Sequence, residues 1–291
     1  MKFWKMNGTG NDFIIINNLE EKLPQEAFPE LARTLCERHL SIGADGLMVV
    51  EASELADYKM LFYNSDGSLG EMCGNGARCI CRYGYETGLA GEIQRVETTA
   101  GLVTGWRIDR RNYKIRLNDP SVIDLDRPVN VEGTTYLCSY VELGNPGIPH
   151  AVVPISGLKD YPQRELFDFG RKLRYNEAFY KGVNVNFYEI IGPDHILEWT
   201  YERGVEDFTY ACGTGTGSLV SVLALKGQVS GTNVCVDVPG GRLVIDVELE
   251  GAEPQGEAVA AGKEKRVKNL YLTGPTNIVA KGEVTDEEVR L

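Results

Sequence analysis

The stretch CGNGARC at residues 73–79 decides the fold, because a close copy, CGTGTGS, stands at residues 212–218. Each copy is a cysteine followed by Gly-x-Gly, and each opens a run that ends at a glycine, Gly88 in the first copy and Gly227 in the second. A glycine-rich turn followed by a run closed by glycine indicates a helix that begins just after each cysteine. The sequence therefore predicts one supersecondary unit that occurs twice.

The residues around the two motifs repeat with them. Asn64 lies nine residues before Cys73, and Arg203 lies nine residues before Cys212. The first unit is expected to cover residues 1–118 and the second residues 119–268, with strands in residues 269–291 returning to the first unit.

Short runs rich in β-branched and aromatic residues dominate the rest of the chain. DFIIINN, LMVVEA and YKMLFY are typical of strands. PELARTLCERHL, residues 29–40, has the spacing of an amphipathic helix whose buried face includes Cys36 and Leu40, with His39 near its end. LEGAEPQGEAVAAGKEK, residues 249–265, is interpreted as a surface excursion between strands.

Composition excludes several classes of protein. The 291 residues carry a formal net charge of −12, which repels phosphate backbones and anionic lipid surfaces. The sequence has no apolar run of the roughly 18 residues that a membrane span needs, and no signal peptide is recognised at its start. We therefore expect a cytoplasmic protein whose partner is a small molecule, with no nucleic acid and no membrane.

Seven cysteines, an odd number, are scattered along the chain, which argues against a disulfide framework. Cys-x5-Cys-x-Cys with only three histidines does not have the spacing of a zinc site, so no metal is expected. Core positions are expected for Cys36, Cys79, Cys81, Cys138 and Cys235.

Cys73 and Cys212 are different, because each precedes a predicted helix. The positive end of a helix favours a thiolate and lowers the pKa of a cysteine there. The free N–H groups of Gly74-Asn75 and Gly213-Thr214 are suited to an anion such as a carboxylate. The alternative is that both cysteines are small core residues at tight turns.

Two such units that face one another would place two thiols around one bound carboxylate. One thiolate would take the α-proton from one face of the α-carbon, and the opposite thiol would return a proton on the other face. The N–H groups would stabilise the enediolate-like carboxylate that develops. This chemistry inverts a stereocentre without a metal or pyridoxal phosphate, so no cofactor is expected.

These motifs resemble the diaminopimelate epimerase family over nearly the whole chain. MNGTGNDF, NSDGS, EMCGNGARC, PHAVV, VNVNF, YERGVED and ACGTGTGS stand in the family's order. The resemblance implies an α/β (α+β) fold of two pseudo-symmetric domains, each a mixed sheet wrapped around a central helix, with the site in the cleft between them. It also implies an isomerase that interconverts LL- and meso-diaminopimelate in lysine and peptidoglycan precursor biosynthesis. A homodimer is a further expectation.

The resemblance also implies roles for individual residues. Cys73 and Cys212 match the two catalytic thiols, and His150 and Glu202 match positions that assist catalysis. The remaining matches are to substrate-binding positions: Asn11, Asn64, Gly74, Asn75, Asn184, Glu202, Arg203, Gly213 and Thr214. On their spacing alone, Asn11 and Asn64 also suit turns, Glu202-Arg203 a solvated pair, and His150 the end of a strand.

Three departures from the family's pattern concern the substrate. Gly46 stands where many members have glutamine, Ile148 stands where a substrate-binding asparagine is usual, and VEDFTYACG differs from the commoner run before the second cysteine. A racemase of another amino acid such as histidine, with the same two thiols, is therefore the second hypothesis. A thiol redox or zinc-binding protein is the hypothesis from a different class.

Overall fold

The computed structural model describes residues 1–70, 73–251 and 265–285, and the chain divides into two compact units. Unit 1 consists of Met1–Ile115 together with the segment from Thr273 onward, and unit 2 is Arg116–Leu272. Most of the surface excursion expected at 249–265 lies outside the described residues, so that interpretation stays a prediction, as do the domain boundaries inferred from the sequence.

Unit 1 holds a sheet in which the hydrogen-bonded neighbours run β17, β1, β2, β3, β4, β5, β6, β7. From β1 to β6 the pairings are antiparallel, parallel, antiparallel, parallel and antiparallel. The strands are β1 (Lys2–Gly8), β2 (Asn11–Asn17), β3 (Gly46–Glu51), β4 (Tyr58–Asn64), β5 (Ile93–Thr98), β6 (Gly101–Arg107), β7 (Asn112–Arg116) and β17 (Asn277–Glu283). The strands predicted in DFIIINN, LMVVEA and YKMLFY are confirmed as β2, β3 and β4.

Unit 2 repeats this order of pairings. Its neighbours run β8, β9, β10, β11, β12, β14, β15, and from β9 to β15 the pairings are again antiparallel, parallel, antiparallel, parallel and antiparallel. The strands are β8 (Pro120–Val131), β9 (Thr134–Leu143), β10 (Ile148–Pro154), β11 (Asn184–Gly192), β12 (His195–Glu202), β13 (Asp207–Thr209), β14 (Val234–Val238) and β15 (Gly241–Glu250). β13 pairs with the end of β12, and β16 (Arg266–Pro275) contains the break between the units.

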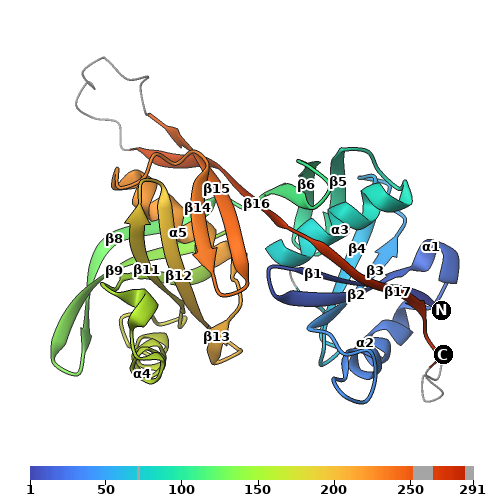
Figure 1. Ribbon diagram of the computed structural model, residues 1–291, viewed down its shortest axis with the longest axis horizontal. Coiled ribbons are helices and arrows are strands. Elements are labelled where there is room, and N and C mark those ends of the chain that lie inside the picture. Colours follow the sequence, from blue (N-terminus) through green and yellow to red (C-terminus); the bar gives the residue numbers. More distant parts are fainter. Residues whose placement is uncertain (71–72, 252–264, 286–291) are drawn as a thin grey trace. The chain divides into compact units, whose positions relative to one another are not determined.

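Helices occupy equivalent places in the two units (Figure 1). α3 (Gly74–Thr87) lies between β4 and β5 in the chain, and α5 (Gly213–Leu225) follows β12 and β13 and leads to β14. α2 (Phe28–Cys36) and α4 (Gln163–Arg174) connect the other parallel pairs, β2–β3 and β10–β11. The short helices are α1 (Asn18–Glu21), η1 (Gln25–Ala27) and η2 (Leu158–Asp160).

α3 and α5 are the central helices, each packed against strands of its own unit. α3 contacts β1, β2 and β6, and α5 contacts β9, β10, β11 and β15. Eleven consecutive residues of α3, from Gly74 to Gly84, are buried. The expected fold class, a mixed sheet around a central helix in each of two similar units, is confirmed.

Two details of the sequence interpretation are wrong. α2 ends at Cys36, which is buried as expected, but the following turn leaves Leu40 83% exposed instead of on the buried face of the helix. Cys235 is only half-buried, because alternation along β14 turns Val234 and Val236 to the inside and Cys235 to the other side. Cys79, Cys81 and Cys138 are buried, as predicted.

The packing of α3 leaves no room for a side chain at Gly84. An added Cβ would lie 2.6 Å from the Tyr58 hydroxyl oxygen and 2.7 Å from Gln94 Oε1, and Tyr58 donates a 2.9 Å hydrogen bond to that same Oε1. We expect Gly84→Ala to lower the free energy of unfolding by about 1–3 kcal/mol, measured by urea denaturation. Gly91→Ala is the control, since nothing lies within 4 Å of its added Cβ. Equal stability of the two variants would contradict the close packing of α3.

Candidate active site

Cys73 and Cys212 occupy the same position in the two units, the residue that caps the N-terminus of the central helix. Their backbones are extended, with φ −104° and ψ 120° at Cys73 and φ −116° and ψ 100° at Cys212. The Cys212 thiol receives a hydrogen bond from the Gly215 backbone in the first turn of α5. The prediction that each cysteine stands at the start of a helix is confirmed.

The first-turn N–H groups of an α-helix take no part in the hydrogen-bond ladder of the helix backbone. The amides at the start of a helix have no carbonyl four residues earlier to bond, and they lie at its positive end. In unit 1 these amides belong to Gly74-Asn75, and in unit 2 to Gly213-Thr214. Each unit thus places a thiol at the N-terminus of its central helix, and anion binding by the amides there stays a prediction.

Asn11 is brought directly to the helix of unit 1. Asn75 Nδ2 donates a hydrogen bond to Asn11 Oδ1, and Asn11 Nδ2 donates to Asp45 Oδ2 at 3.1 Å. Asn64, at the end of β4, lies opposite Gly46 and donates to Ser68 Oγ at 2.9 Å. Asn11 is therefore a member of the site around Cys73, whereas the contacts of Asn64 are those of a turn.

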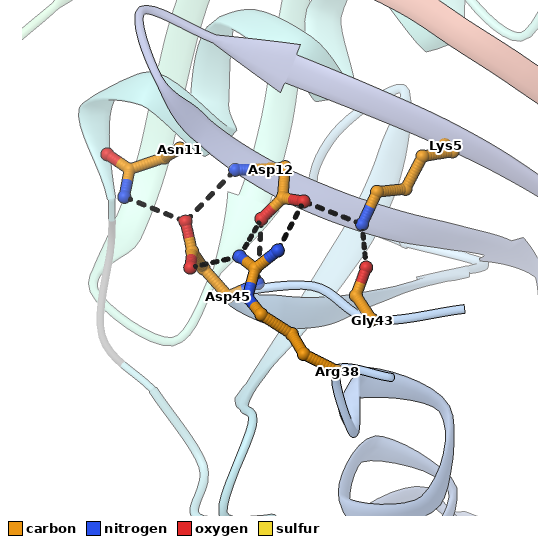
Figure 2. Close-up of polar contacts among 6 residues, drawn as sticks. All are labelled: Lys5, Asn11, Asp12, Arg38, Gly43 and Asp45. Carbon is orange, nitrogen blue, oxygen red and sulfur yellow. Dashed lines mark hydrogen bonds and ion pairs between the residues drawn. The ribbon is translucent and has the colours of Figure 1, made fainter. Parts of the chain in front are cut away.

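A cluster of charged residues holds Asp45 in place (Figure 2). Arg38 Nη2 lies 2.6 Å from Asp12 Oδ1 and 2.8 Å from Asp45 Oδ1, and Lys5 Nζ lies 2.8 Å from Asp12 Oδ2 and also donates to the Gly43 carbonyl. Burial opposes ionisation of Asp12, but its hydrogen bonds from Arg38 and Lys5 outweigh burial and lower its pKa. The cluster holds Asp45 where its Oδ2 accepts the hydrogen bond from Asn11.

Arg78 is a buried cation one turn into α3. Its side chain is fully buried and donates to Thr9 Oγ1 at 2.7 Å and to Asn75 Oδ1 at 3.0 Å. Burial lowers its pKa to about 10, which still leaves it charged at neutral pH, and its charge interacts with that of Cys73. A nearby cation favours the thiolate form of a cysteine. Sequence reasoning assigned Arg78 no role.

In unit 2, the predicted residues His150, Asn184 and Glu202-Arg203 come together at one end of three strands. His150 on β10 pairs with Asn184 on β11, and Asn184 Oδ1 accepts a 2.8 Å hydrogen bond from the Arg203 backbone N–H. Arg203 Nη1 donates to the Lys181 carbonyl at 3.0 Å. The charge of Glu202 acts on Cys212, and that of Arg203 acts on His150, which places both charges near the start of α5.

Cys212 does not have the lowered pKa expected at a helix start. Burial raises the pKa of its thiol well above the usual value, and the negative charges of Glu202 and Glu198 raise it further. Hydrogen bonds from Thr214 and from the Gly215 backbone act in the opposite direction but are outweighed. The prediction is therefore wrong for Cys212, because burial and nearby carboxylates dominate over the helix end.

A buried polar network runs from β10 to α5 behind Cys212. His150 Nδ1 lies 3.0 Å from Asn186 Oδ1, Asn186 Nδ2 donates to Glu198 Oε1 at 2.9 Å, and Thr216 Oγ1 lies 2.5 Å from Glu198 Oε2. All four side chains are buried. Sequence reasoning missed Asn186, Glu198 and Thr216. Period-two alternation along VNVNF was the available signal, since it puts Asn186 on the same face as Asn184.

His150 is neutral in this network. Asn186 Oδ1 can only accept, so His150 Nδ1 carries the proton, and Nε2 is a buried acceptor with no hydrogen-bond partner among the residues described. Burial and the charge of Arg203 lower the pKa of His150 to about 4, although the bond to Asn186 acts to raise it.

Two further observations concern only the residues that the structure describes. In that part of the chain, His, Cys, Asp and Glu residues form no group of three or more that could hold a metal ion. Its helices include none that is long and apolar enough to cross a membrane.

Comparison with known proteins matches the chain to one family model. The model described as diaminopimelate epimerase matches residues 3–123 and 143–267. The diaminopimelate epimerase of Aquifex aeolicus is 36% identical over 299 residues, covering 99% of both chains. The diaminopimelate epimerase of Archaeoglobus fulgidus is 37% identical over 266 residues, covering 88% of this chain and 92% of its own.

Solved structures share the fold at low identity. A probable proline racemase from Agrobacterium radiobacter superposes with a TM-score of 0.70 at 16% identity, covering 99% of this chain and 95% of its own. A hydroxyproline epimerase from Agrobacterium vitis gives a TM-score of 0.69 at 18% identity, covering 98% of this chain and 90% of its own.

The buried neutral state of His150 predicts how stability depends on pH. Because the pKa falls from about 6.5 in the unfolded chain to about 4 in the fold, the stabilising contribution is complete above pH 6.5 and is lost as the pH falls through 4. We expect the stability difference between wild type and His150→Gln to shrink by about 3 kcal/mol from pH 7.5 to pH 3.5, measured by denaturant unfolding.

His39→Gln is the control for this measurement, since His39 is exposed and lies outside the buried network. It should leave the wild-type pH dependence in place. A constant difference between His150→Gln and wild type across this range would show that the pKa of His150 does not change on folding.

Proposed function

Because the chain belongs to the diaminopimelate epimerase family, we propose that it interconverts LL- and meso-diaminopimelate, an isomerisation in lysine and peptidoglycan precursor biosynthesis. The observation that carries the proposal is the matched pair of cysteines, Cys73 and Cys212, each at the N-terminus of a buried central helix. Family membership favours this isomerase over the thiol redox and zinc-binding hypotheses.

The proposed chemistry is a proton transfer at the α-carbon by two bases. One cysteine thiolate removes the α-proton, and the electron pair of the broken C–H bond delocalises into the carboxylate. The other cysteine, as a thiol, gives its proton to the opposite face of the same carbon, so thiol and thiolate exchange places and no electrons are lost. The amides of Gly74-Asn75 and Gly213-Thr214 hold the carboxylate and stabilise its added charge.

The surroundings of the two thiols support an assignment of the resting state. Cys73 lies near the buried cation Arg78, which favours its thiolate, whereas burial and the carboxylates Glu202 and Glu198 keep Cys212 protonated. In the proposed resting enzyme Cys73 is therefore the base and Cys212 the acid. The next turnover in the same direction requires the two protonation states to be restored.

We propose that Asn11, Asn64, Asn184, Glu202 and Arg203 bind the substrate. Arg203 offers a planar set of donors suited to a distal carboxylate, and Glu202 offers an acceptor for an ammonium group. His150 and Glu202 assist catalysis, His150 as a neutral group anchored to Asn186. The Arg203 backbone N–H donates a 2.8 Å hydrogen bond to Asn184 Oδ1, and this bond fixes the backbone of Arg203 relative to β11.

The second candidate is a racemase of another amino acid, and the observation that favours it is Ile148. This residue opens β10 and is half-buried, two residues before His150. An apolar side chain there replaces the amide usual in the family and suits a different distal end on the substrate.

We propose a cytoplasmic enzyme. Its seven cysteines are free, and a mechanism that needs two reduced thiols suits a reducing compartment. A homodimer is proposed on family resemblance alone.

Exchange of the α-proton tests the reaction. In D2O, wild-type protein should incorporate deuterium at the α-carbon of diaminopimelate and interconvert its isomers. Cys73→Ala and Cys212→Ala should each lower kcat for epimerisation by roughly 10²–10⁴-fold or more, because each removes one of the two proton carriers. Cys235→Ala, a half-buried cysteine on β14 outside both sites, should keep wild-type turnover. If either active-site variant retains most of its turnover, the two-base mechanism is wrong.

Substrate choice tests the assignment of Arg203. A substrate without a second amino-acid head cannot form hydrogen bonds with the Arg203 guanidinium or the Glu202 carboxylate, and a hydrogen bond to a charged group is worth about 1.5–3 kcal/mol. We expect kcat/KM for diaminopimelate to exceed that for alanine, lysine or histidine by at least about tenfold, and Arg203→Ala to reduce this preference.

Arg242→Ala, which removes an arginine paired with Asp237 in unit 2, should leave the preference intact. Equal or faster turnover of a single-headed amino acid by the wild type would favour the second candidate and leave the two-thiol mechanism standing.

A further inference from the structure

Glu198 is a fully buried carboxyl group whose two oxygens are both hydrogen-bonded. Oε1 accepts from Asn186 Nδ2 at 2.9 Å, and Oε2 lies 2.5 Å from Thr216 Oγ1. Glu198 sits on β12, and Thr216 lies four residues after Cys212 on α5. The carboxyl is therefore connected to the helix that carries the second thiol.

Thr216 has two acceptors for one hydroxyl proton. Its Oγ1 lies 2.5 Å from Glu198 Oε2 and 3.0 Å from the Cys212 carbonyl oxygen. When Glu198 is ionised, the Thr216 hydroxyl must donate to the carboxylate, since both oxygens of a carboxylate are acceptors. When Glu198 is protonated on Oε2, the carboxyl donates to Thr216 Oγ1, and the Thr216 proton turns to the Cys212 carbonyl.

The other members of the network cannot respond in this way. Asn186 Nδ2 donates to both Glu198 and Thr200 Oγ1 at 2.9 Å, while Asn186 Oδ1 accepts from His150. The Asn186 amide also packs closely against α5, because a Cβ added at Gly215 would lie only 2.2 Å from Asn186 Nδ2. The Thr216 hydroxyl is therefore the group in this network whose hydrogen-bond direction changes with the protonation state of Glu198.

The groups that face Glu198 leave its charge uncompensated. His150 on β10 is neutral, and Cys212 stands at the start of α5. Glu202, a second acidic residue, lies further along β12. β14 supplies the buried Val236, opposite Ile196, while Asp237 on the same strand is paired with His195 and Arg242. Burial, partly offset by Thr216 and Asn186, raises the pKa of Glu198 to about 7, so both states are populated near neutral pH.

We propose that Glu198 is a positioning residue that, acting through Thr216 and through its own charge, shifts the balance between the thiol and the thiolate of Cys212. The ionised carboxylate disfavours a second negative charge on Cys212, and protonation of Glu198 removes that opposition while adding a hydrogen bond at the Cys212 carbonyl. A role of Glu198 in catalysis rests on the proposed function. Its effect on the ionisation of the Cys212 thiol is independent of that function.

The test measures the thiolate of Cys212 without any substrate. Full-length protein is alkylated with iodoacetamide between pH 5 and 10, and mass spectrometry gives the rate at each cysteine. Glu198→Gln removes the charge and keeps a side chain of the same shape, so at pH 8–9 Cys212 should react faster than in wild type, about tenfold for each unit by which its pKa falls. Cys73 is the internal control and should keep its wild-type profile.

A matched pair of variants at Thr216 tests the hydroxyl itself. Thr216→Val removes the donor to Glu198, which makes ionisation of the carboxyl harder and moves the inflection in the Cys212 profile to higher pH. Thr216→Ser keeps the hydroxyl and should restore the wild-type profile. This pair also decides the matter if Glu198→Gln fails to fold, as judged by circular dichroism.

Superimposed Cys212 profiles for folded wild type, Glu198→Gln and Thr216→Val would overturn the proposal, as would a Cys212 that is unreactive in every variant up to pH 10. Shifted profiles in a protein that does not exchange the α-proton of diaminopimelate would support the role of Glu198 and refute the proposed function instead.

Discussion

The structure depends on burying a whole helix inside the sheet of each unit. The buried turns of such a helix meet no water, so the polar groups there need partners within the protein. On α5 the hydroxyls of Ser218 and Ser221 bond back to the carbonyls of Thr214 and Gly217 at 2.8 and 2.7 Å, and Thr216 bonds to Glu198. On α3 the terminal nitrogens of the fully buried Arg78 donate to Thr9, Asn75 and the Gly74 carbonyl, whereas its Nε has no partner among the described residues.

This burial also determines where chemistry can occur. The interior of a buried helix is inaccessible, and each cysteine stands at the helix N-terminus, where the first amides lie outside the hydrogen-bond ladder of the helix. Cys73 and Cys212 stand at these equivalent places, yet their electrostatic surroundings differ: a buried arginine acts on the first and two carboxylates act on the second. A repeated backbone therefore places its two cysteines in different electrostatic surroundings.

Most of the fold could be predicted from local patterns. Spacing between the two cysteine motifs indicated a duplicated unit, and Gly-x-Gly followed by an apolar run indicated the helix starts, because turns and helix caps depend on neighbouring residues. The raised pKa of Cys212 and the role of Glu198 could not be predicted this way. Both depend on burial against residues from other strands, and no spacing in the sequence reports how deeply a carboxyl group lies. The burial of Leu40 was predicted wrongly for a similar reason. The apolar periodicity extends to Leu40, but the helix ends at Cys36 and a turn follows.

The pairing of β17 with β1 affects the order in which the chain can fold as it is synthesised. β17 begins at Asn277, so the last strand of unit 1 leaves the ribosome only after all of unit 2 has been made. Until then β1 has an unpaired edge, and such an edge invites pairing with another chain. Unit 2 is continuous in the sequence and is complete at Leu272. The nascent protein therefore carries a finished second unit while its first unit, with Asn11 and Cys73 already in place along the chain, still waits for its closing strand.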